Sequence, residues 1–128
     1  MQREIGDLKV SSQGKDQLTT LKRHTGLKNW NVLCRWALCM SLADASPPLI
    51  RDVVADSNVE MTWKTFAGRD EYAYLRLLMH RNAIEDLYDN DLTKLLHIHV
   101  HRGLGILSGL GIRGPEGLAV LAHEAESP

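Results

Sequence analysis

The part of the chain that most constrains its fold is a strongly apolar segment in the first half of the sequence. It begins at Asn29 or Asn31, runs to about Ala45, and places apolar residues on almost every turn of a helix. Pro47 and Pro48 should end it, because proline provides no backbone N–H and restricts the residue before it. A helix this apolar has to be buried on most of its sides, under other helices of the same chain or under another chain.

The residues before this segment predict a strand, a helix and a turn. Residues 5–11 alternate apolar and polar side chains over a short stretch, which fits a strand or an extended arm. Ser11 or Ser12 can cap a first helix over residues 13–25, and Gly26 then stands where a helix end favours positive φ. The expected order is therefore strand or arm, helix, turn and apolar helix.

Two further helices are expected in the second half of the chain. Residues 49–67 are patterned weakly and indicate a long surface connection with a short strand. Helical periodicity returns over residues 69–85 and 91–110, and Gly103 inside the last helix indicates a close helix crossing. Residues 111–128 are broken by Gly and Pro, which predicts a loose last helix and disorder. The residues that recur at helical spacing in the first of these helices are Tyr72, Leu75, Leu78 and Met79. The residues expected along the inward stripe of the last helix are Leu92, Leu95, Leu96, His99, Gly103, Ile106, Leu107 and Leu110.

Length and composition favour one small, mainly helical domain. A chain of 128 residues with 44% apolar content can build a single core, so we expect one domain over residues 1–128 with its core at about 5–110. No run of residues is apolar enough to span a membrane, and the start of the chain lacks the apolar core of a secretion signal. These features predict a small helical bundle in the cytoplasm.

Charge is divided unevenly along the chain. Residues 1–35 contain seven Lys or Arg and three acids, a net charge of +4, whereas residues 36–128 carry a net charge of −5. This asymmetry indicates one region that faces a polyanion, although an ordinary solvated helix face can also be basic. The candidate contacts with DNA phosphates are Lys9, Lys15, Lys22, Arg23, Lys28 and Arg35.

Three of these cations are the strongest candidates. Lys15 and Lys22 lie seven residues apart, near one face of the first predicted helix, and Lys28 follows the turn. Arg35 is the weakest candidate, because it sits within the apolar helix and can instead pair with an acid between subunits. No cluster of Asn, Gln or Arg is arranged for reading base edges, so we expect contacts with the DNA backbone.

Alternating histidines in the last predicted helix do not predict a metal centre. Of His97, His99 and His101, only His97 and His101 share a helix face, and two histidines alone make a poor metal site. We interpret them as an exposed or interface pair. At a subunit junction such a pair would make assembly sensitive to pH.

Four carboxylates, Glu85, Asp86, Asp89 and Asp91, fall where a loop joins the two last predicted helices. They lack the spacing and the glycine of an EF-hand, so we interpret them as a solvated loop in which Asp91 or Asn90 caps the next helix. The sequence contains no phosphate-binding loop, nucleophile elbow or dinucleotide fingerprint. We therefore predict no catalysis, no cofactor and no metal.

Several segments of the chain resemble a known family. They are LKRHTGLKNWNVLCRWALCMSL, the PP after it, DEYAYLRLLMHR and HVHRGLGIL. Together they resemble the DNA sulfur modification protein DndE family over roughly residues 5–110, and the TGL turn followed by NVLCRWALCMSL is the most specific part. This chain carries an extra residue near Lys28 to Trp30 relative to a TGLTPN-type spacing, which leaves the start of the second helix open.

The resemblance implies a small, mainly helical, oligomeric DNA-binding subunit of the phosphorothioation system, in which sulfur replaces a non-bridging phosphate oxygen of DNA. Family members resemble ribbon-helix-helix proteins in the order strand, helix, turn, helix, and some assemble as tetramers that favour nicked duplex DNA. The sulfur chemistry belongs to partners: a cysteine desulfurase, a DndC-like iron–sulfur subunit and a DndD-like ATPase subunit. A member would therefore grip DNA and present it to these partners without being the catalyst.

Two other functions remain open on the sequence alone. A free-standing ribbon-helix-helix repressor would insert the strand around Lys9 into the major groove of a palindromic operator and bind it tightly. A protein adaptor would instead dock to an ATPase partner through its acidic C-terminal part and bind DNA negligibly. Binding to intact, nicked and scrambled duplexes separates the three functions.

Overall fold

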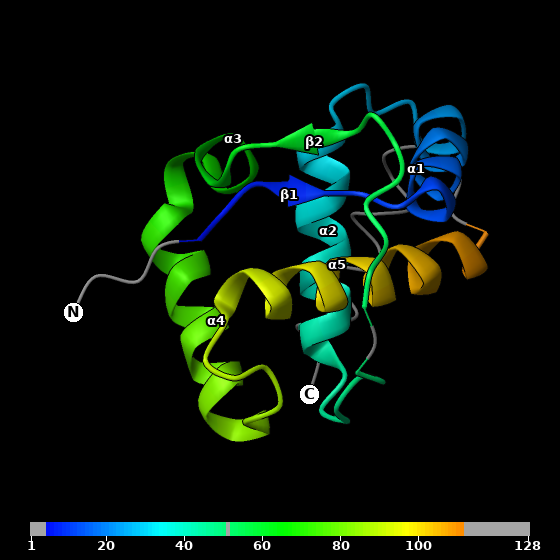
Figure 1. The fold of residues 1–128 in the computed structure, drawn as a ribbon. Coiled ribbons are helices and arrows are strands. Elements are labelled where there is room, and N and C mark those ends of the chain that lie inside the picture. Colours follow the sequence, from blue (N-terminus) through cyan, green and yellow to red (C-terminus); the bar gives the residue numbers. More distant parts are fainter. Residues whose placement is uncertain (1–4, 51, 112–128) are drawn as a thin grey trace, which may run out of the picture.

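The computed structural model of the protein describes residues 5–50 and 52–111 and is mainly helical, as the sequence predicts. The elements are β1 (Leu8–Lys9), α1 (Ser12–Thr25), α2 (Trp30–Ala43), β2 (Glu60–Met61), α3 (Trp63–Ala67), the 3-10 helix η1 (Gly68–Asp70), α4 (Glu71–Glu85) and α5 (Leu92–Gly109). The order strand, helix, turn, helix is confirmed by β1, α1 and α2 (Figure 1). Nearly all of the expected C-terminal tail lies outside the described residues. No helix in the described ranges is long and apolar enough to cross a membrane.

Helices α2 and α5 cross at the centre of the molecule (Figure 1). Gly103 of α5 lies directly against the backbone of Ala37 in α2, which confirms the close crossing expected from a glycine inside this helix. Leu33 and Leu38 of α2 and Leu104 of α5 are fully buried in the same core. The apolar segment that dominates the sequence is thus covered largely by helices of its own chain.

The ends of α1 follow the prediction closely. The Ser11 hydroxyl accepts a hydrogen bond from the backbone N–H of Gly14 at 3.0 Å, which makes it the N-cap. At the other end Gly26 has a φ of 76°, and its N–H donates to the Lys22 carbonyl. These two caps fix the direction in which α1 enters the turn before α2.

Helix α2 ends earlier than the prolines predict. Its last residue is Ala43, four residues before Pro47, and Asp44 is already extended. The Asp44 carboxylate accepts hydrogen bonds from the backbone N–H and the hydroxyl of Ser46 at 2.9 and 2.7 Å. This local turn competes with the helix, so a side-chain cap ends α2 before any proline is reached.

The connection before α4 contains a short helix that the sequence pattern did not predict. β2 is the expected strand, but Trp63 begins α3 instead of continuing an extended segment. The Thr62 hydroxyl accepts a hydrogen bond from the Thr65 N–H at 3.1 Å and so caps this helix. The ring of Trp63 stacks on Phe66 with centroids 5.7 Å apart. A helix of five residues is too short for its periodicity to show in the sequence.

Helix α4 exposes much of its apolar surface. A helix was predicted over residues 69–85, and α4 begins at Glu71 with Leu78 buried. Tyr72 and Met79, which recur at helical spacing with Leu78, are 81% and 40% exposed, so these residues do not form one buried stripe. Apolar residues occur all around α4, and periodicity therefore does not select its buried face.

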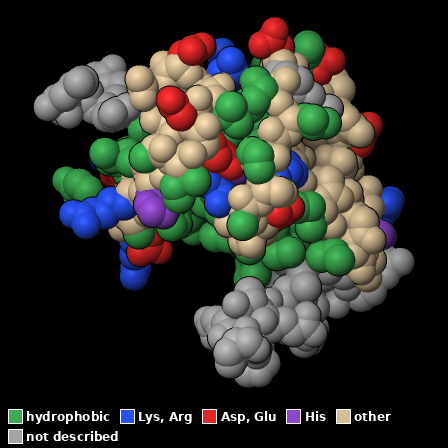
Figure 2. Space-filling view, turned by 90° about the horizontal axis from the view of Figure 1, so that it is seen from below, with side chains coloured by type: hydrophobic (Ala, Val, Ile, Leu, Met, Phe, Trp, Pro, Cys, Tyr) green, Lys and Arg blue, Asp and Glu red, His purple; other side chains and the backbone are tan. Residues whose placement is uncertain are grey.

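The underside of the molecule carries many hydrophobic side chains (Figure 2). The exposed large apolar residues of α4 and the loop after it are Tyr72, Leu77, Met79, Ile84 and Leu87.

Candidate nucleic-acid interface

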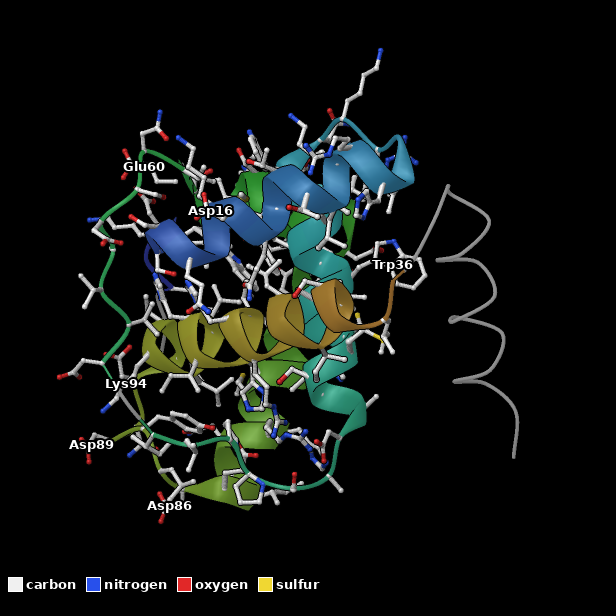
Figure 3. All side chains as sticks on the ribbon, turned by 90° about the vertical axis from the view of Figure 1, so that its right-hand side faces the viewer. Asp16, Trp36, Glu60, Asp86, Asp89 and Lys94 are labelled. Carbon is white, nitrogen blue, oxygen red and sulfur yellow. The ribbon has the colours of Figure 1, made fainter. Side chains whose placement is uncertain are left out.

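Helix α1 and the turn after it present a group of cationic side chains. Lys15 and Lys22 are seven residues apart on α1, and both are half-buried along their stems. Arg23 beside them and Lys28 in the turn are exposed. Side chains project outward from α1 and from this turn, away from the core (Figure 3). At 3.6 residues per turn, the three cations of α1 span an arc of about 100°. Lys15, Lys22 and Arg23 therefore share one side of α1, and Lys28 lies in the turn that follows.

Two of these lysines are positioned by neighbouring residues. The Lys15 Nζ donates a hydrogen bond to the Asn58 Oδ1 at 2.6 Å. The Lys22 Nζ lies 4.0 Å from the centroid of the Trp30 ring, a cation–π contact. Both contacts hold a cation at the protein surface without neutralising its charge. Asn58 and Trp30 therefore orient the candidate phosphate contacts.

Trp30 is a candidate site residue that the sequence analysis missed. It is the first residue of α2 and lines a hollow of about 340 Å³ together with Lys15, Asn58, Val59 and Glu60. An aromatic ring beside cations is typical of nucleic-acid surfaces, because bases can stack on it. The available signal was its position between two basic segments, directly after the turn that carries Lys28.

Arg23 of α1 and Lys28 of the turn have no partner among the described residues. Neither Arg23 nor Lys28 makes a side-chain hydrogen bond or ion pair within the described part of the chain. Their side chains can move to meet a ligand. Asp16 also projects from α1 (Figure 3) and is the one acidic side chain of that helix. It reduces the net charge of the surface without pairing with Arg23 or Lys28.

Lys9 lies on β1, which pairs antiparallel with β2. Leu8 is opposite Met61, and Lys9 is opposite Glu60. Lys9 and Glu60 are both exposed and carry opposite charges across the strand pair. The Lys9 side chain therefore has an acidic neighbour, which makes it a weaker phosphate contact than the cations of α1.

Arg35 is placed differently from the other candidates. Its Nη1 donates to the Phe66 carbonyl at 3.2 Å, and a Cβ added to Gly68 would lie 2.9 Å from the same nitrogen. The guanidinium thus ties α2 to the end of α3. This contact within the chain occupies the side chain that we expected to contact DNA or an acid between subunits.

His97 and His101 are not an exposed pair, and the structure corrects that interpretation. His101 is 8% exposed and His97 is half-buried. The Nε2 of His97 accepts a hydrogen bond from the Lys9 backbone N–H at 2.9 Å, and the Nε2 of His101 accepts one from the Ser11 N–H at 3.0 Å. Both rings thus face the protein's own N-terminal strand. Within residues 5–50 and 52–111, no group of three His, Cys, Asp or Glu side chains could hold a metal ion.

The four carboxylates before α5 do not form one solvated loop. Asp86 and Asp89 are exposed and point outward (Figure 3). Asp91 caps α5 as predicted, because its Oδ1 accepts the Thr93 N–H at 3.0 Å. Glu85 is the exception, since its side chain is only 3% exposed and turns into the core.

Glu85 belongs to a buried network that joins α2, α4 and α5. The His99 ring lies 2.7 Å from the Ser41 Oγ through Nδ1 and 3.0 Å from the Glu85 Oε1 through Nε2. Because the Arg102 Nε donates to Ser41 at 2.8 Å, we assign the Ser41 hydroxyl as donor to His99 and the His99 Nε2–H as donor to Glu85. The Tyr88 hydroxyl also donates to Glu85. The serine, histidine and acid are ordered as in a hydrolase, but Ser41 and His99 are fully buried, so the network fastens helices instead of meeting a substrate.

Burial sets the protonation states of this network. Desolvation lowers the pKa of His99 from its ordinary value, although the Glu85 carboxylate acts in the opposite direction. Burial and the adjacent Glu85 carboxylate raise the pKa of Tyr88, which keeps its hydroxyl protonated as a donor. Glu85 is also paired with Arg81, whose Nε lies 3.3 Å from Oε2. The His99 imidazole thus sits between the Glu85 carboxyl group and the Ser41 hydroxyl.

A mainly helical fold with the order strand, helix, turn, helix is what the family resemblance implies. The family model described as DNA sulphur modification protein DndE matches residues 7–110, which include every helix and strand named above. The chain belongs to the DndE family. Membership places it among proteins of DNA sulfur modification. A search of curated proteins found no match to this chain.

Two solved structures have the same fold as this DndE family member. DndE from Escherichia coli B7A, described as involved in DNA phosphorothioation modification, is 24% identical and has a TM-score of 0.67, with 84% of this chain and 99% of that chain covered. A DndE G21/24K mutant, described as involved in DNA phosphorothioation, is 20% identical and has a TM-score of 0.62, covering 83% of this chain and 99% of that chain. The helical architecture is thus common to DndE proteins of low sequence identity.

Proposed function

We propose that this DndE family member is the DNA-binding, non-catalytic subunit of a cytoplasmic DNA phosphorothioation system. It binds duplex DNA, including nicked duplex, through the phosphate backbone. It presents this DNA to DndC-like and DndD-like subunits that insert sulfur. The observation that carries this proposal is the cationic surface of α1 and its turn, formed by Lys15, Lys22, Arg23 and Lys28. Membership of a DNA sulfur modification family supports DNA as the polyanion that this surface meets.

The contacts proposed for this surface are electrostatic. Each lysine or arginine that neutralises a phosphate releases condensed counterions, so affinity falls with salt by a slope of about 0.9 per contact. Arg23 and Lys28 are free to reach a phosphate, while Lys15 and Lys22 are held at the surface by Asn58 and Trp30. We rank Lys9 and Arg35 as minor contacts, because each has a neighbour within the chain.

A role without catalysis is supported by the placement of the buried network. The Ser41 hydroxyl contacts His99, the Tyr88 hydroxyl contacts Glu85 and His99, and both residues are fully buried. The Ser41 oxygen also accepts a hydrogen bond from Arg102, which would weaken it as a nucleophile. We therefore assign the sulfur chemistry to the partner subunits.

We further propose that copies of the chain assemble, as a tetramer, through the exposed apolar side chains of α4. Tyr72 and Ile84 of this helix are 81% and 62% exposed, and Leu77, between them in the sequence, is 44% exposed. Large apolar side chains gathered on one helix indicate a protein contact. Assembly repeats the α1 surface, and several modest cationic patches raise the affinity for one long duplex.

The repressor alternative needs a strand that pairs with a second copy and enters the major groove. Here β1 already pairs with β2, and the Lys9 N–H on its other edge is bonded to His97. Both edges of β1 are therefore engaged within the chain. This geometry favours backbone contacts by α1 over base readout by a ribbon.

Fluorescence anisotropy on intact, nicked and scrambled duplexes across a salt series tests the proposed function. We expect comparable affinities for scrambled sequences, equal or tighter binding to nicked duplex, and a salt slope of about −3 to −4 for four contacts. Tight binding to one palindrome only would support a repressor. Negligible binding at low salt would support the adaptor function and contradict the proposal.

A further inference from the structure

Two histidines of α5 hold the outer edge of the N-terminal strand. His97 and His101 are four residues apart and accept the backbone N–H groups of Lys9 and Ser11, which are two residues apart, at 2.9 and 3.0 Å. One helical step of four residues rises about 6.0 Å, and two extended residues span about 6.7 Å, so the two spacings match. The two rings stand where a third strand would otherwise pair with β1.

The hydrogen bonds fix the protonation state of both rings. The Nδ1 of His97 lies 2.7 Å from the Thr93 carbonyl, and the Nδ1 of His101 lies 2.7 Å from the His97 carbonyl. A carbonyl only accepts, so each Nδ1 carries a hydrogen, and a backbone N–H only donates, so each Nε2 carries a lone pair. Each ring is therefore neutral in this arrangement. A proton on Nε2 would place the ring N–H opposite the backbone N–H of the strand, and the two donors would repel each other. The strand N–H would then have no acceptor.

We propose that His97 and His101 form a pH-operated latch, which docks β1 and the start of α1 on α5 at neutral pH and releases them in mild acid. Docking is coupled to the loss of protons, so the docked form prevails above the titration range of histidine and declines below it. The latch is a property of this chain alone and does not depend on the proposed DNA binding.

The first turn of α1 packs against the ring of His101. A Cβ added to Gly14 would lie 2.6 Å from Val10 and 3.3 Å from the ring of His101, so α1 approaches that ring closely. Ser11, whose N–H the latch holds, is also the N-cap of α1. Release of the latch therefore loosens the arm that carries Lys9 and the beginning of the helix that carries the candidate phosphate contacts.

Charged groups line a hollow beside each ring. The hollow at His101 is lined by Asp52, Asp56 and Arg102, and the hollow at His97 by Asp52, Asp91 and Lys94. The carboxylates favour protonation of a released ring, and the two cations oppose it. Hydrogen bonds from Ser12 hold the pKa of Asp56 below its usual range, so this second tether of α1 stays ionised in mild acid. The latch thus opens while Ser12 remains bound to Asp56.

The expected size of the effect follows from the chemistry of imidazole. A free imidazole with the ordinary pKa of about 6.5 is about 30 times more abundant as the cation than as the neutral form at pH 5. Because docking uses the neutral form of each ring as the acceptor of a strand N–H, protection of the docked strand should fall as the pH is lowered.

Amide hydrogen exchange measured by NMR tests the latch on the full chain. Protection factors of the Lys9 and Ser11 amides, corrected for intrinsic exchange, are compared at pH 7.5 and 5.0. We expect both to fall by about 10-fold or more in the wild type. The double variant His97→Gln, His101→Gln offers a side-chain carbonyl that does not titrate, so its protection factors should change by less than about 3-fold.

His80→Gln is the matched control, because His80 is an exposed histidine of α4 away from the strand. It should keep the full pH response of the wild type. Constant protection of Lys9 and Ser11 in the wild type would overturn the latch. So would an equal loss of protection in the double variant, whether that loss is local or comes from unfolding of the whole chain.

Discussion

A Cβ built on Gly103 of α5 would lie 1.7 Å from the carbonyl oxygen of Ala37 in α2, far inside the contact distance of two unbonded atoms. The clash is with backbone, so rotation of a side chain cannot relieve it. The crossing of α2 and α5 at the centre of the core therefore depends on a position without a side chain.

Replacement of Gly103 by Ala should lower the free energy of unfolding by about 3 kcal/mol, because the two helices must separate to admit one methyl group. Gly105→Ala is the control on the same helix. The nearest atom to its added Cβ is the Gln17 Nε2 at 4.0 Å, so Ala should stabilise the helix by about 0.5 to 1 kcal/mol. Urea unfolding of both variants measures the difference, and equal effects would contradict the close crossing.

The buried His99 should make the fold sensitive to acid. Its folded pKa is lowered by burial, so its contribution to stability is present above the unfolded value of about 6.5 and is lost as the pH falls towards the folded value. In the His97→Gln, His101→Gln background, we expect the free energy of unfolding to level off above about pH 7 and to decline below pH 6.5. Urea unfolding from pH 5 to 8 provides the measurement. A flat profile over that range would show that His99 charges freely in the folded state.

Arg35 and Arg23 should respond in opposite ways to loss of charge. Arg35→Gln removes the hydrogen bond to Phe66 and should cost about 1 to 2 kcal/mol of stability, with little effect on the salt slope of DNA binding. Arg23→Gln should leave stability within about 0.5 kcal/mol and lower the salt slope by about 0.9. Urea unfolding and salt-dependent anisotropy on the same two proteins decide the matter. A reduced slope for Arg35→Gln alone would reverse our assignment.

The exposed apolar side chains of α4 should determine the oligomeric state. The double variant Tyr72→Lys, Ile84→Lys places two charges on the exposed surface of this helix and should reduce the assembly to single protomers, because unpaired charges are costly to bury. Val54→Lys changes a side chain that is 67% exposed outside α4 and should leave the assembly intact. Light scattering reads the mass of each protein. An unchanged mass in the double variant would place the contact elsewhere.

Local chemistry explains what the sequence could predict of the fold. Ser11, Gly26 and Asp91 each act on backbone groups within three or four residues. Gly26 is where the pattern placed it, and Ser11 and Asp91 are each one of the two caps that the pattern offered. Gly103 was informative because glycine inside a helix lowers its stability unless close contact requires it. The caps depend only on neighbouring residues, whereas the helix that Gly103 would meet could not be read from the sequence.

The parts that the sequence could not predict depend on distant residues. Glu85 lies in a charged segment, and only the approach of His99 from α5 turns it into the core. His97 and His101 receive hydrogen bonds from residues nearly ninety positions earlier, at Lys9 and Ser11, which no local pattern records. For the candidate site, charge identified α1 and its turn, but the contact of Arg35 within the chain required the position of α3.

The most direct test of the proposed function is DNA binding by the charge-reversed triple variant Lys15→Glu, Lys22→Glu, Lys28→Glu. A charge-matched control reverses Lys64, Arg69 and Lys94, which lie outside α1 and its turn. Circular dichroism and light scattering establish that both proteins remain folded and assembled. At about 0.1 M salt, we predict that the α1 variant loses at least about 100-fold in affinity for nicked duplex, while the control stays within a few-fold of the wild type. Equal affinity of the two variants would contradict the assignment of the α1 surface as the DNA contact.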